Sequence, residues 1–319
     1  MTFTKKFQWQ KLGLILKPNG SLAWSQSHAQ VPVADYLEKE NIIRVYYSTR
    51  DKTGRSLPGF IELDAENPLK VLYIAPTPIL ELGQLGTFDD CGVMPSWIIN
   101  KGKEKYLYYI GWNVRNTIAY HNSVGLAVSR DNGLTFEKFS NGPLWDRDWK
   151  EPHYSGTSCV MNDEGTWKNW YLSCTEWRVC NGKSEPRYHI KYAESLDGIN
   201  WHRQGQIAID YLTDDEAGIV KASVIKDAGI YYMWFSYRKF NNYRTDLNTS
   251  YRIGYAESKD GINWIRNDMK SGIGVSKSGW DSLMIEYPHV IKVKEKFLMF
   301  YNGNGFGESG FGVAQLSGL

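Results

Sequence analysis

The sequence predicts an all-β fold, a five-bladed β-propeller of four-stranded antiparallel blades, from three observations: one repeat length, one order of strand-like segments and related turns. Five runs rich in aromatic and β-branched residues recur at near-constant spacing. Taking Tyr47, Tyr109, Leu172, Phe235 and Tyr301 as equivalent points, the intervals are 62, 63, 63 and 66 residues. A fixed repeat length indicates a fold of repeated units. Five units fill the chain, so we expect one domain over residues 1–319.

Each repeat contains the same order of strand-like segments. An apolar segment precedes each aromatic run, a third segment such as IKYAES follows it, and a weaker fourth usually precedes the next unit. This order is typical of a four-stranded meander, the blade of a propeller. The five runs are IIRVYYSTR (42–50), KYLYYIGWN (105–113), NWYLSCTEWR (169–178), IYYMWFSYR (230–238) and KFLMFYNGN (296–304).

Three repeats carry related turns after the third segment: SRDNGLTF (129–136), SLDGINW (195–201) and SKDGINW (258–264). Asp-Gly and Asp-Asn-Gly supply the positive φ of a tight hairpin, and the aromatic residue after them is suited to packing between blades. We interpret these turns as structural.

The two ends of the chain are expected to complete one blade together. The last repeat stops after its third segment, FGVAQL (311–316), while WQKLGLIL (9–16) resembles a fourth strand without a blade of its own. Pairing them removes two open sheet edges, so we predict that the N-terminal strand completes the fifth blade.

Composition limits the function. The net charge is +2 and no long basic run occurs, which disfavours nucleic acid and membranes as partners. No apolar stretch approaches the roughly 20 residues of a membrane span, and MTFTKKFQWQ lacks the apolar core of a signal peptide, so a cytoplasmic location is expected. The spacing of the cysteines matches no zinc site, and we expect packed thiols and neither metal nor cofactor. They are Cys91, Cys159, Cys174 and Cys180.

The blade geometry predicts where a site must lie. In a meander blade, the start of the first strand and the end of the second reach the same mouth of the central channel. The side chains at these positions are rich in acids, arginines, histidines and tryptophans, a mixture that suits a carbohydrate because polar groups pair with hydroxyls and indoles stack on sugar rings. The expected substrate-binding residues are His28, Asp89, Trp112, His153, Trp177, Arg178, Lys221, Arg238, His289 and Asn302.

Cleavage of a glycosidic bond needs two carboxyl groups, one protonated to assist the leaving oxygen and one ionised as base or nucleophile. The predicted ring offers Asp90, Glu176, Glu216 and Glu286 as catalytic candidates. Each also has a structural interpretation as an ion-pair partner of the nearby basic residues.

Two segments carry a resemblance to a known superfamily: MIEYPHVIKVKEKFLMFYNG (284–303) and GTFDDCGVMPSWI (86–98). Over essentially the whole chain the sequence resembles the five-bladed glycosidases of glycoside hydrolase families 43, 32, 62, 68 and 130. The first segment is similar to the family 43 pattern Glu-Gly-Pro-His, whose Glu is the general acid, and this implies Glu286. The second resembles the aspartate-bearing strand start of families 32 and 130, which implies Asp90 or Asp89 as base or nucleophile.

The sequence also departs from these families. They usually place a catalytic Asp at the start of the first blade, where this chain has SHAQVPV, with His28 and Gln30. The WxNDPNG, RDP and EC motifs of family 32 are absent. Asp89 follows an aromatic residue, as do Asp146 and Asp281, which favours a loop anchor over a catalyst at that position.

Three functions remain open. The first is a glycoside hydrolase-like enzyme acting on an oligosaccharide or glycan precursor. The second is an inverting glycoside phosphorylase, similar to family 130, in which the basic residues hold inorganic phosphate as a second substrate. The third is a non-catalytic glycan-binding propeller, favoured by the missing first-blade Asp.

Overall fold

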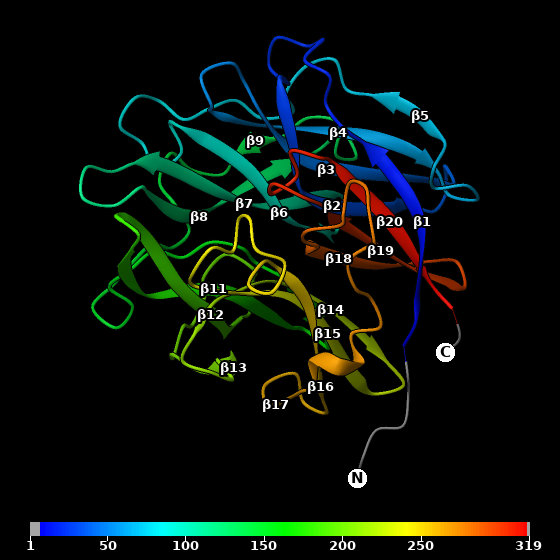
Figure 1. Cartoon of the computed structure of the whole chain (residues 1–319). Helices are drawn as coiled ribbons and strands as arrows, with labels where there is room; N and C mark the ends of the chain where they lie inside the picture. The colour runs from blue at the N-terminus through cyan, green and yellow to red at the C-terminus, as the bar shows by residue number, and fades with distance from the viewer. Residues whose placement is uncertain (1–6, 318–319) are drawn as a thin grey trace.

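The computed structural model describes residues 7–317, and this part of the chain is all-β. Besides the strands it has one short 3₁₀ turn, η1 (Asp268–Lys270). Figure 1 shows the strands and their connections in chain order. Residues 1–6, which begin the segment on which the expected location rests, lie outside the described residues.

The strands form five antiparallel units of four, as the repeat predicts. Within the first four units each strand pairs with the next one along the chain. The first unit is β2 (Ser27–Leu37), β3 (Ile42–Arg50), β4 (Ser56–Asp64) and β5 (Val71–Ile74). The second is β6 (Gly92–Lys101), β7 (Glu104–Val114), β8 (Tyr120–Ser129) and β9 (Glu137–Lys138).

The third and fourth units have the same plan. The third is β10 (Val160–Asp163), β11 (Thr166–Cys180), β12 (Lys183–Ser195) and β13 (Ile207–Ile209). The fourth is β14 (Glu216–Asp227), β15 (Ile230–Lys239), β16 (Arg252–Ser258) and β17 (Trp264–Arg266).

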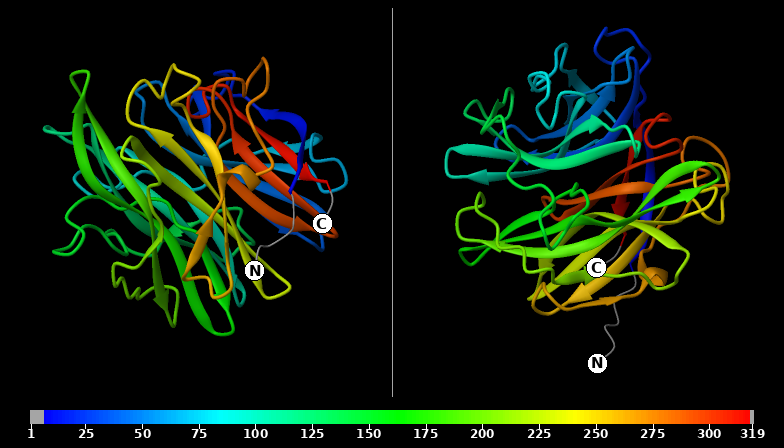
Figure 2. Two further views of the ribbon diagram at one scale, coloured as in Figure 1. Left: turned by 60° about the horizontal axis from the view of Figure 1, so that its bottom comes forward. Right: turned by 90° about the vertical axis from the view of Figure 1, so that its left-hand side faces the viewer.

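The fifth unit joins the two ends of the chain. It consists of β18 (Glu286–Val293), β19 (Lys296–Asn302), β20 (Phe311–Leu316) and β1 (Trp9–Leu16), in the order β1-β20-β19-β18. β1 runs antiparallel to β20, with Trp9 opposite Leu316, and the two strands lie side by side in Figure 1 and in the left view of Figure 2. The prediction that the N-terminal strand completes the last unit is confirmed.

The first strands of the units contact one another. β2 contacts both β6 and β18, β14 contacts β18, and β10 contacts β6. Buried apolar side chains fill the spaces between units; Trp167 and Trp170 of the third unit, for example, belong to one cluster with Tyr231 and Phe235 of the fourth. This mutual burial of strand faces stabilises units that have too little core to fold alone.

Bulges interrupt the first strands of four units near their starts. In three of these strands a bulge residue other than glycine has a positive φ: Val31 (52°), Lys221 (57°) and Tyr287 (54°). Such a backbone is strained, above all for the β-branched Val31. In each case a polar side chain of another unit accepts the backbone N–H: Asn302 Oδ1 for Val31, Thr157 Oγ1 for Lys221 and Ser236 Oγ for Tyr287.

The Asp-Gly turns dock onto neighbouring units, which supports their structural interpretation. Within each turn, the aspartate accepts backbone N–H groups of the residues that follow it, as Asp197 does from Ile199 and Asn200. An aromatic side chain of the preceding unit donates to the carbonyl of the turn glycine. The three pairs are Tyr46–Gly133, Tyr108–Gly198 and Trp170–Gly261.

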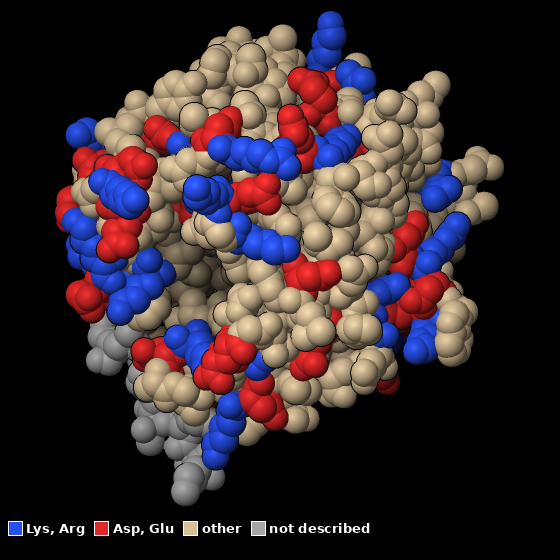
Figure 3. All heavy atoms as spheres, turned by 180° about the vertical axis from the view of Figure 1, so that it is seen from behind, with Lys and Arg blue, Asp and Glu red and all other residues tan. Residues whose placement is uncertain are grey.

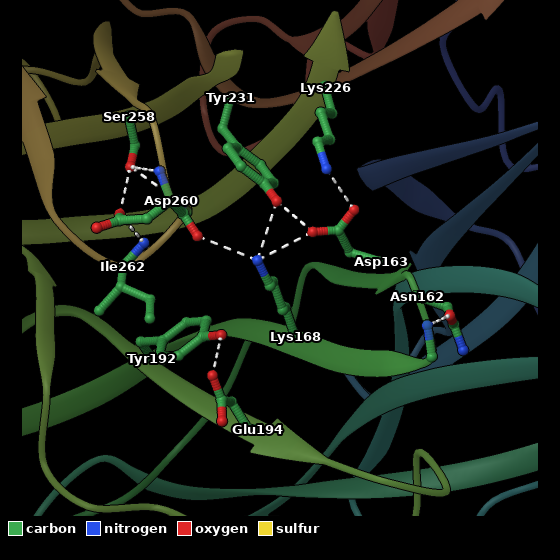
Figure 4. Close-up of polar contacts among 12 residues, drawn as sticks. Asn162, Asp163, Lys168, Tyr192, Glu194, Lys226, Tyr231, Ser258, Asp260 and Ile262 are labelled. Atoms are coloured by element: carbon green, nitrogen blue, oxygen red, sulfur yellow. Dashed lines mark hydrogen bonds and ion pairs between the residues drawn. The ribbon is translucent and has the colours of Figure 1, made fainter. Parts of the chain in front are cut away.

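A polar cluster joins the third and fourth units near the turns that follow their first strands (Figure 4). Lys168 Nζ donates to the Tyr231 hydroxyl at 2.9 Å and to the Asp260 carbonyl at 3.0 Å. Asp163 accepts from Tyr231 and forms ion pairs with Lys168 and Lys226. These contacts hold the pKa of Asp163 well below its usual range. All of its charged members have partners, so we assign the cluster to inter-unit packing.

The surface carries mixed charge. On the face seen in Figure 3, Lys and Arg side chains are interspersed with Asp and Glu, and a hollow opens among them. Within the described residues, no helix has the length and apolar character needed to cross a membrane.

Candidate active site

A cavity of about 480 Å³ receives side chains from all five units. Its walls come from the starts of first strands, the ends of second strands and the adjoining loops, which is where the blade geometry places a site. The lining includes Gln30, Val31, Arg50, Trp112, Tyr120, Tyr154, Tyr188, Val220, Arg238, Tyr243, Arg244, Tyr251 and Tyr287.

The cavity wall contains three arginines and no Asp or Glu. Arg244 is neutralised, because its Nη1 lies 2.5 Å from Glu185 Oε1. Arg50 donates from Nε to Gln30 Oε1 at 3.3 Å and has no ion pair among residues 7–317. Arg238 likewise has no ion pair in this part of the chain, and it is 1% exposed. The wall is therefore electropositive.

Arg238 is held in place by neutral groups. Nε donates to Tyr251 Oη at 3.2 Å, Nη1 to the Lys239 carbonyl and Nη2 to the Pro186 carbonyl. Its guanidinium lies over the ring of Tyr243, 3.9 Å from the centroid. Three of its five N–H donors are thus used, and no carboxylate of residues 7–317 forms an ion pair with it.

Tyrosines form much of the remaining wall. The hydroxyls of Tyr188 and Tyr251 share a hydrogen bond, and those of Tyr120 and Tyr154 lie 3.4 Å apart. Burial raises the pKa of Tyr154 and Tyr251 well above the usual value, so these phenols stay neutral and can both donate and accept. Together with Trp112, they provide flat apolar faces edged with hydroxyls, as a sugar-binding site requires.

Glu286 lies behind this wall. Its side chain is fully buried, and neither carboxyl oxygen has a hydrogen-bond partner. It interacts electrostatically with Arg238, Tyr251 and Tyr287, which all line the cavity. Glu286 precedes the positive-φ residue of its bulge, as Gln30 and Val220 do in their units, and both of these line the cavity. Burial raises the pKa of Glu286 well above its usual range, although Arg238 lowers it.

The structure does not bring the four catalytic candidates together in the cavity. Glu216 is buried in a bidentate pair with Arg266, at 2.6 and 2.9 Å, and accepts the Leu212 N–H. Glu176 pairs with Arg178 and Arg187, which lower its pKa. In the structure both carboxylates pair with basic residues, Glu176 through Oε1 alone, and neither lines the cavity.

Asp89 and Asp90 differ from each other. Asp89 is buried, accepts from Tyr109 Oη at 3.0 Å and pairs with Lys138 at 2.7 Å. Asp281 has the same kinds of partner in Tyr301 and Lys11, so Asp89 is a loop anchor, not a substrate contact. Asp90 accepts the Gly86 N–H on Oδ2, its Oδ1 is buried without a partner, and no cation pairs with it among residues 7–317. It does not line the cavity.

Trp112 and Arg238 are the predicted binding residues that line the cavity. Trp177 packs behind Tyr120 and Tyr154, while Arg178 is exposed beside Glu176. His28 lies near Arg50, and burial together with that charge lowers its pKa to about 4. His153 is half-buried outside the cavity wall.

Three further predicted binding residues serve the packing of the first strands. Asn302 is buried and hydrogen-bonds the backbone of Ala29 and Val31, tying the last unit to the first. Lys221 and His289 are fully enclosed, with Nζ 3.5 Å from Nδ1. In the structure these three residues take part in packing, and none of them lines the cavity.

The sequence analysis did not select several cavity residues. Tyr243, Arg244 and Tyr251 lie in or next to the connection between β15 and β16, and Tyr188 lies early in β12, all outside the strand positions used for the prediction. Arg50 ends a second strand and satisfied the positional rule. That position, at the end of a second strand, is the signal that could have selected it. Among residues 7–317, no group of three or more His, Cys, Asp or Glu side chains is placed to hold a metal ion.

Solved structures share the fold of this chain. A thermostable family-43 glycoside hydrolase is 19% identical, with a TM-score of 0.64 over 95% of this chain and 91% of that one. A glycosyl hydrolase from Bacteroides ovatus is 16% identical, with a TM-score of 0.68 over 98% and 94%. A structure from the GH130 family of mannoside phosphorylases, which contains glycoside hydrolases, is 15% identical, with a TM-score of 0.68 over 99% and 95%. The chain thus has the all-β fold of these glycosidases, which confirms the resemblance at the level of fold.

Two proteins of Mycobacterium tuberculosis show which family the chain belongs to. They are Uncharacterized protein MT1551, of strain CDC 1551 / Oshkosh, and Uncharacterized protein Rv1502, of strain ATCC 25618 / H37Rv. Each is 39% identical over 308 residues, which cover 97% of this chain and 99% of the relative. The chain belongs to the family of these two proteins. No family model matches it.

Proposed function

We propose that the chain is a single-domain, five-bladed β-propeller and that the cavity is the active site of a glycosidase-class enzyme acting on an oligosaccharide or glycan precursor. Five four-stranded units, contacts between their first strands and the completion of the last unit by β1 support the architecture. The likeness in fold to glycoside hydrolases supports the class of reaction.

The observation that carries the proposal is Glu286, a buried carboxyl beside the cavity whose oxygens have no partner. Burial disfavours the charged form of such a carboxyl and raises its pKa, which favours the protonated form. A protonated carboxyl is what a general acid must be in order to donate to the leaving oxygen of a glycoside. Since Glu286 is fully buried, this role requires a shift of the intervening side chains when the substrate binds.

Asp90 is the remaining candidate for the second carboxyl group. Asp89, Glu176 and Glu216 each pair with a cation, whereas Asp90 does not. In a hydrolase its carboxylate would act as base or nucleophile. This role also requires movement, because Asp90 lies outside the cavity wall.

The test is turnover of Glu286→Gln on aryl glycosides and oligosaccharides. The amide keeps the shape of the side chain but cannot supply the proton, so we expect a loss of at least about a hundredfold in turnover, with thermal stability retained. Glu257→Gln is the control, because Glu257 is also buried but accepts from Tyr255 and lies outside the cavity wall. Near-normal turnover of Glu286→Gln would remove Glu286 from the acid role.

One observation favours a second candidate, an inverting glycoside phosphorylase. Arginines line the cavity while carboxylates do not, and phosphorolysis needs an acid and a bound phosphate in place of a second carboxylate. The same screen, run with and without inorganic phosphate, separates the two reactions. Phosphate-dependent turnover that survives Asp90→Asn would favour phosphorolysis. Phosphate-independent turnover lost in Asp90→Asn would favour hydrolysis, and sugar binding without turnover would favour a non-catalytic binding protein.

A further inference from the structure

We infer that the cavity selects a carbohydrate bearing its own anionic group, a carboxylate or a phosphate ester, which Arg50 and Arg238 hold. The inference rests on the proposed function and names the substrate class of that same site.

Arg50 has hydrogen-bond donors that no described residue uses. Its Nε donates to Gln30, while neither terminal nitrogen has a hydrogen-bond partner among the described residues. The side chain lines the cavity at the end of β3. Glu308 interacts electrostatically with Arg50 but forms no ion pair with it. A guanidinium cannot lose its proton under ordinary conditions, so two terminal nitrogens of a permanent cation adjoin the cavity without a protein acceptor.

The charge of Arg238 is not balanced by an ion pair within residues 7–317. A buried charge bonded only to carbonyls and a phenol is costly unless an opposite charge approaches it. Glu286 interacts electrostatically with Arg238 but makes no ion pair with it, and burial favours the protonated form of that acid. Since Arg238 lines the cavity and retains two unused N–H donors, the missing countercharge can come from a ligand.

Arg238 and Arg50 are connected through two tyrosines of the cavity wall. Arg238 donates to Tyr251, whose ring centroid lies 6.0 Å from that of Tyr287, and Tyr287 in turn interacts electrostatically with Arg50. The aromatic side chains of Trp112, Tyr120 and Tyr154 line other parts of the same cavity. A sugar ring stacked on these faces would direct a charged substituent toward the guanidinium groups, where bidentate hydrogen bonds to a carboxylate or phosphate are strongest.

The experiment compares matched pairs of ligands by isothermal titration calorimetry. The pairs are methyl β-D-glucuronide with methyl β-D-glucoside, and mannose 6-phosphate with mannose; inorganic phosphate is titrated alone. We expect at least one charged sugar to bind about tenfold or more tightly than its neutral counterpart, the factor of one charge-assisted hydrogen bond. The advantage should shrink as salt is added.

Variants assign the effect to the arginine. Arg50→Gln should remove most of the preference for the charged sugar. Arg50→Lys keeps the positive charge but loses the bidentate geometry of the guanidinium, so it should restore part of that preference. Arg115→Gln is the control because Arg115 is exposed and lies outside the cavity wall. Thermal unfolding of each variant shows that it is folded before binding is compared.

Three results would overturn the inference. They are equal affinity within both pairs, no binding of any sugar at millimolar concentration, and inorganic phosphate binding as tightly as the sugar phosphate while glucuronide and glucoside do not differ. The last result would assign the arginines to a phosphate co-substrate. Because binding is measured without turnover, a protein that cleaves no glycoside can still pass this test, and an active enzyme can fail it.

Discussion

At the scale of single residues, the unusual groups are charged side chains buried without an opposite charge. Arg238 lines the cavity and Glu286 lies behind its wall, so both are placed to respond to a bound ligand. Lys221 differs, because it is enclosed between the ring of Trp97, 5.0 Å from Nζ, and His289. Burial lowers its pKa to about 8. The buried charge of Lys221 destabilises the folded protein at neutral pH, and Lys221 does not line the cavity.

Lys221→Met should therefore stabilise the protein at pH 7. Shifting the pKa of a lysine from 10.5 to about 8 corresponds to about 3 kcal/mol of unfavourable free energy in the folded state, so the variant should gain up to about that amount. The penalty is fully present below pH 8, where both states are protonated. It fades as pH rises toward 10.5, because the folded state loses the proton first. Urea unfolding at pH 7.0, 8.5 and 9.5 measures the change.

The control for this prediction is Lys226→Met on the same strand. Lys226 pairs with Asp163, which raises its pKa, so it remains charged in both states across this pH range. The stability difference between Lys226→Met and the parent should not depend on pH. A Lys221→Met variant that is less stable than the parent at pH 7 would show that the contacts with Trp97 and His289 outweigh the buried charge.

At the scale of elements, the bulged first strands explain how the cavity is lined. At Val31, Lys221 and Tyr287 the bulge frees one backbone N–H from the ladder, and the side chain of another unit accepts it. The strained residues Val31 and Tyr287 face the cavity as a result. Strain of this kind persists only where surrounding contacts impose it, so the bulges and their acceptors should act as units.

Ser236→Ala tests this coupling. Removing the hydroxyl leaves the buried N–H of Tyr287 without an acceptor, which should lower the free energy of unfolding by about 1–3 kcal/mol. Ser140→Ala is the matched control, because the Ser140 hydroxyl accepts the Gly142 N–H in an exposed loop where water can replace it. Urea unfolding compares the two. Equal effects of the two substitutions would contradict a role for the bulge contact.

Strands and their order can be predicted from the sequence, whereas the partners of charged side chains cannot. The repeat spacing, the aromatic runs and the unpaired segment at residues 9–16 predict the units and their closure, because the strand pattern is local. The roles of individual carboxylates are not local. Glu216 is neutralised by Arg266, 50 residues away on an outer strand, and Asp89 by Lys138, and neither pairing has a sequence signal. Arg244 lines the cavity from the connection between β15 and β16, and the strand pattern does not define the path of that connection.

At the scale of the whole molecule, the cavity exists because units distant along the chain meet. Arg50 of the first unit and Tyr287 of the fifth share one wall, and Asn302 ties β19 to the start of β2. These contacts depend on the last unit being complete. That unit depends on β1, the one strand that the other end of the chain supplies.

Removal of residues 1–17 should therefore open the molecule at this point. The truncated chain would expose the edge of β20, so we expect a lower unfolding temperature and association at higher concentration, measured by calorimetry and size-exclusion chromatography. A synthetic peptide of residues 7–17 added in trans should raise the unfolding temperature toward that of the full chain, because its backbone can pair with β20 as β1 does. A scrambled peptide of the same composition should not. If the truncated chain unfolds at the parent temperature and stays monomeric, closure by β1 does not stabilise the fold, and the dependence of the cavity wall on that strand would be refuted.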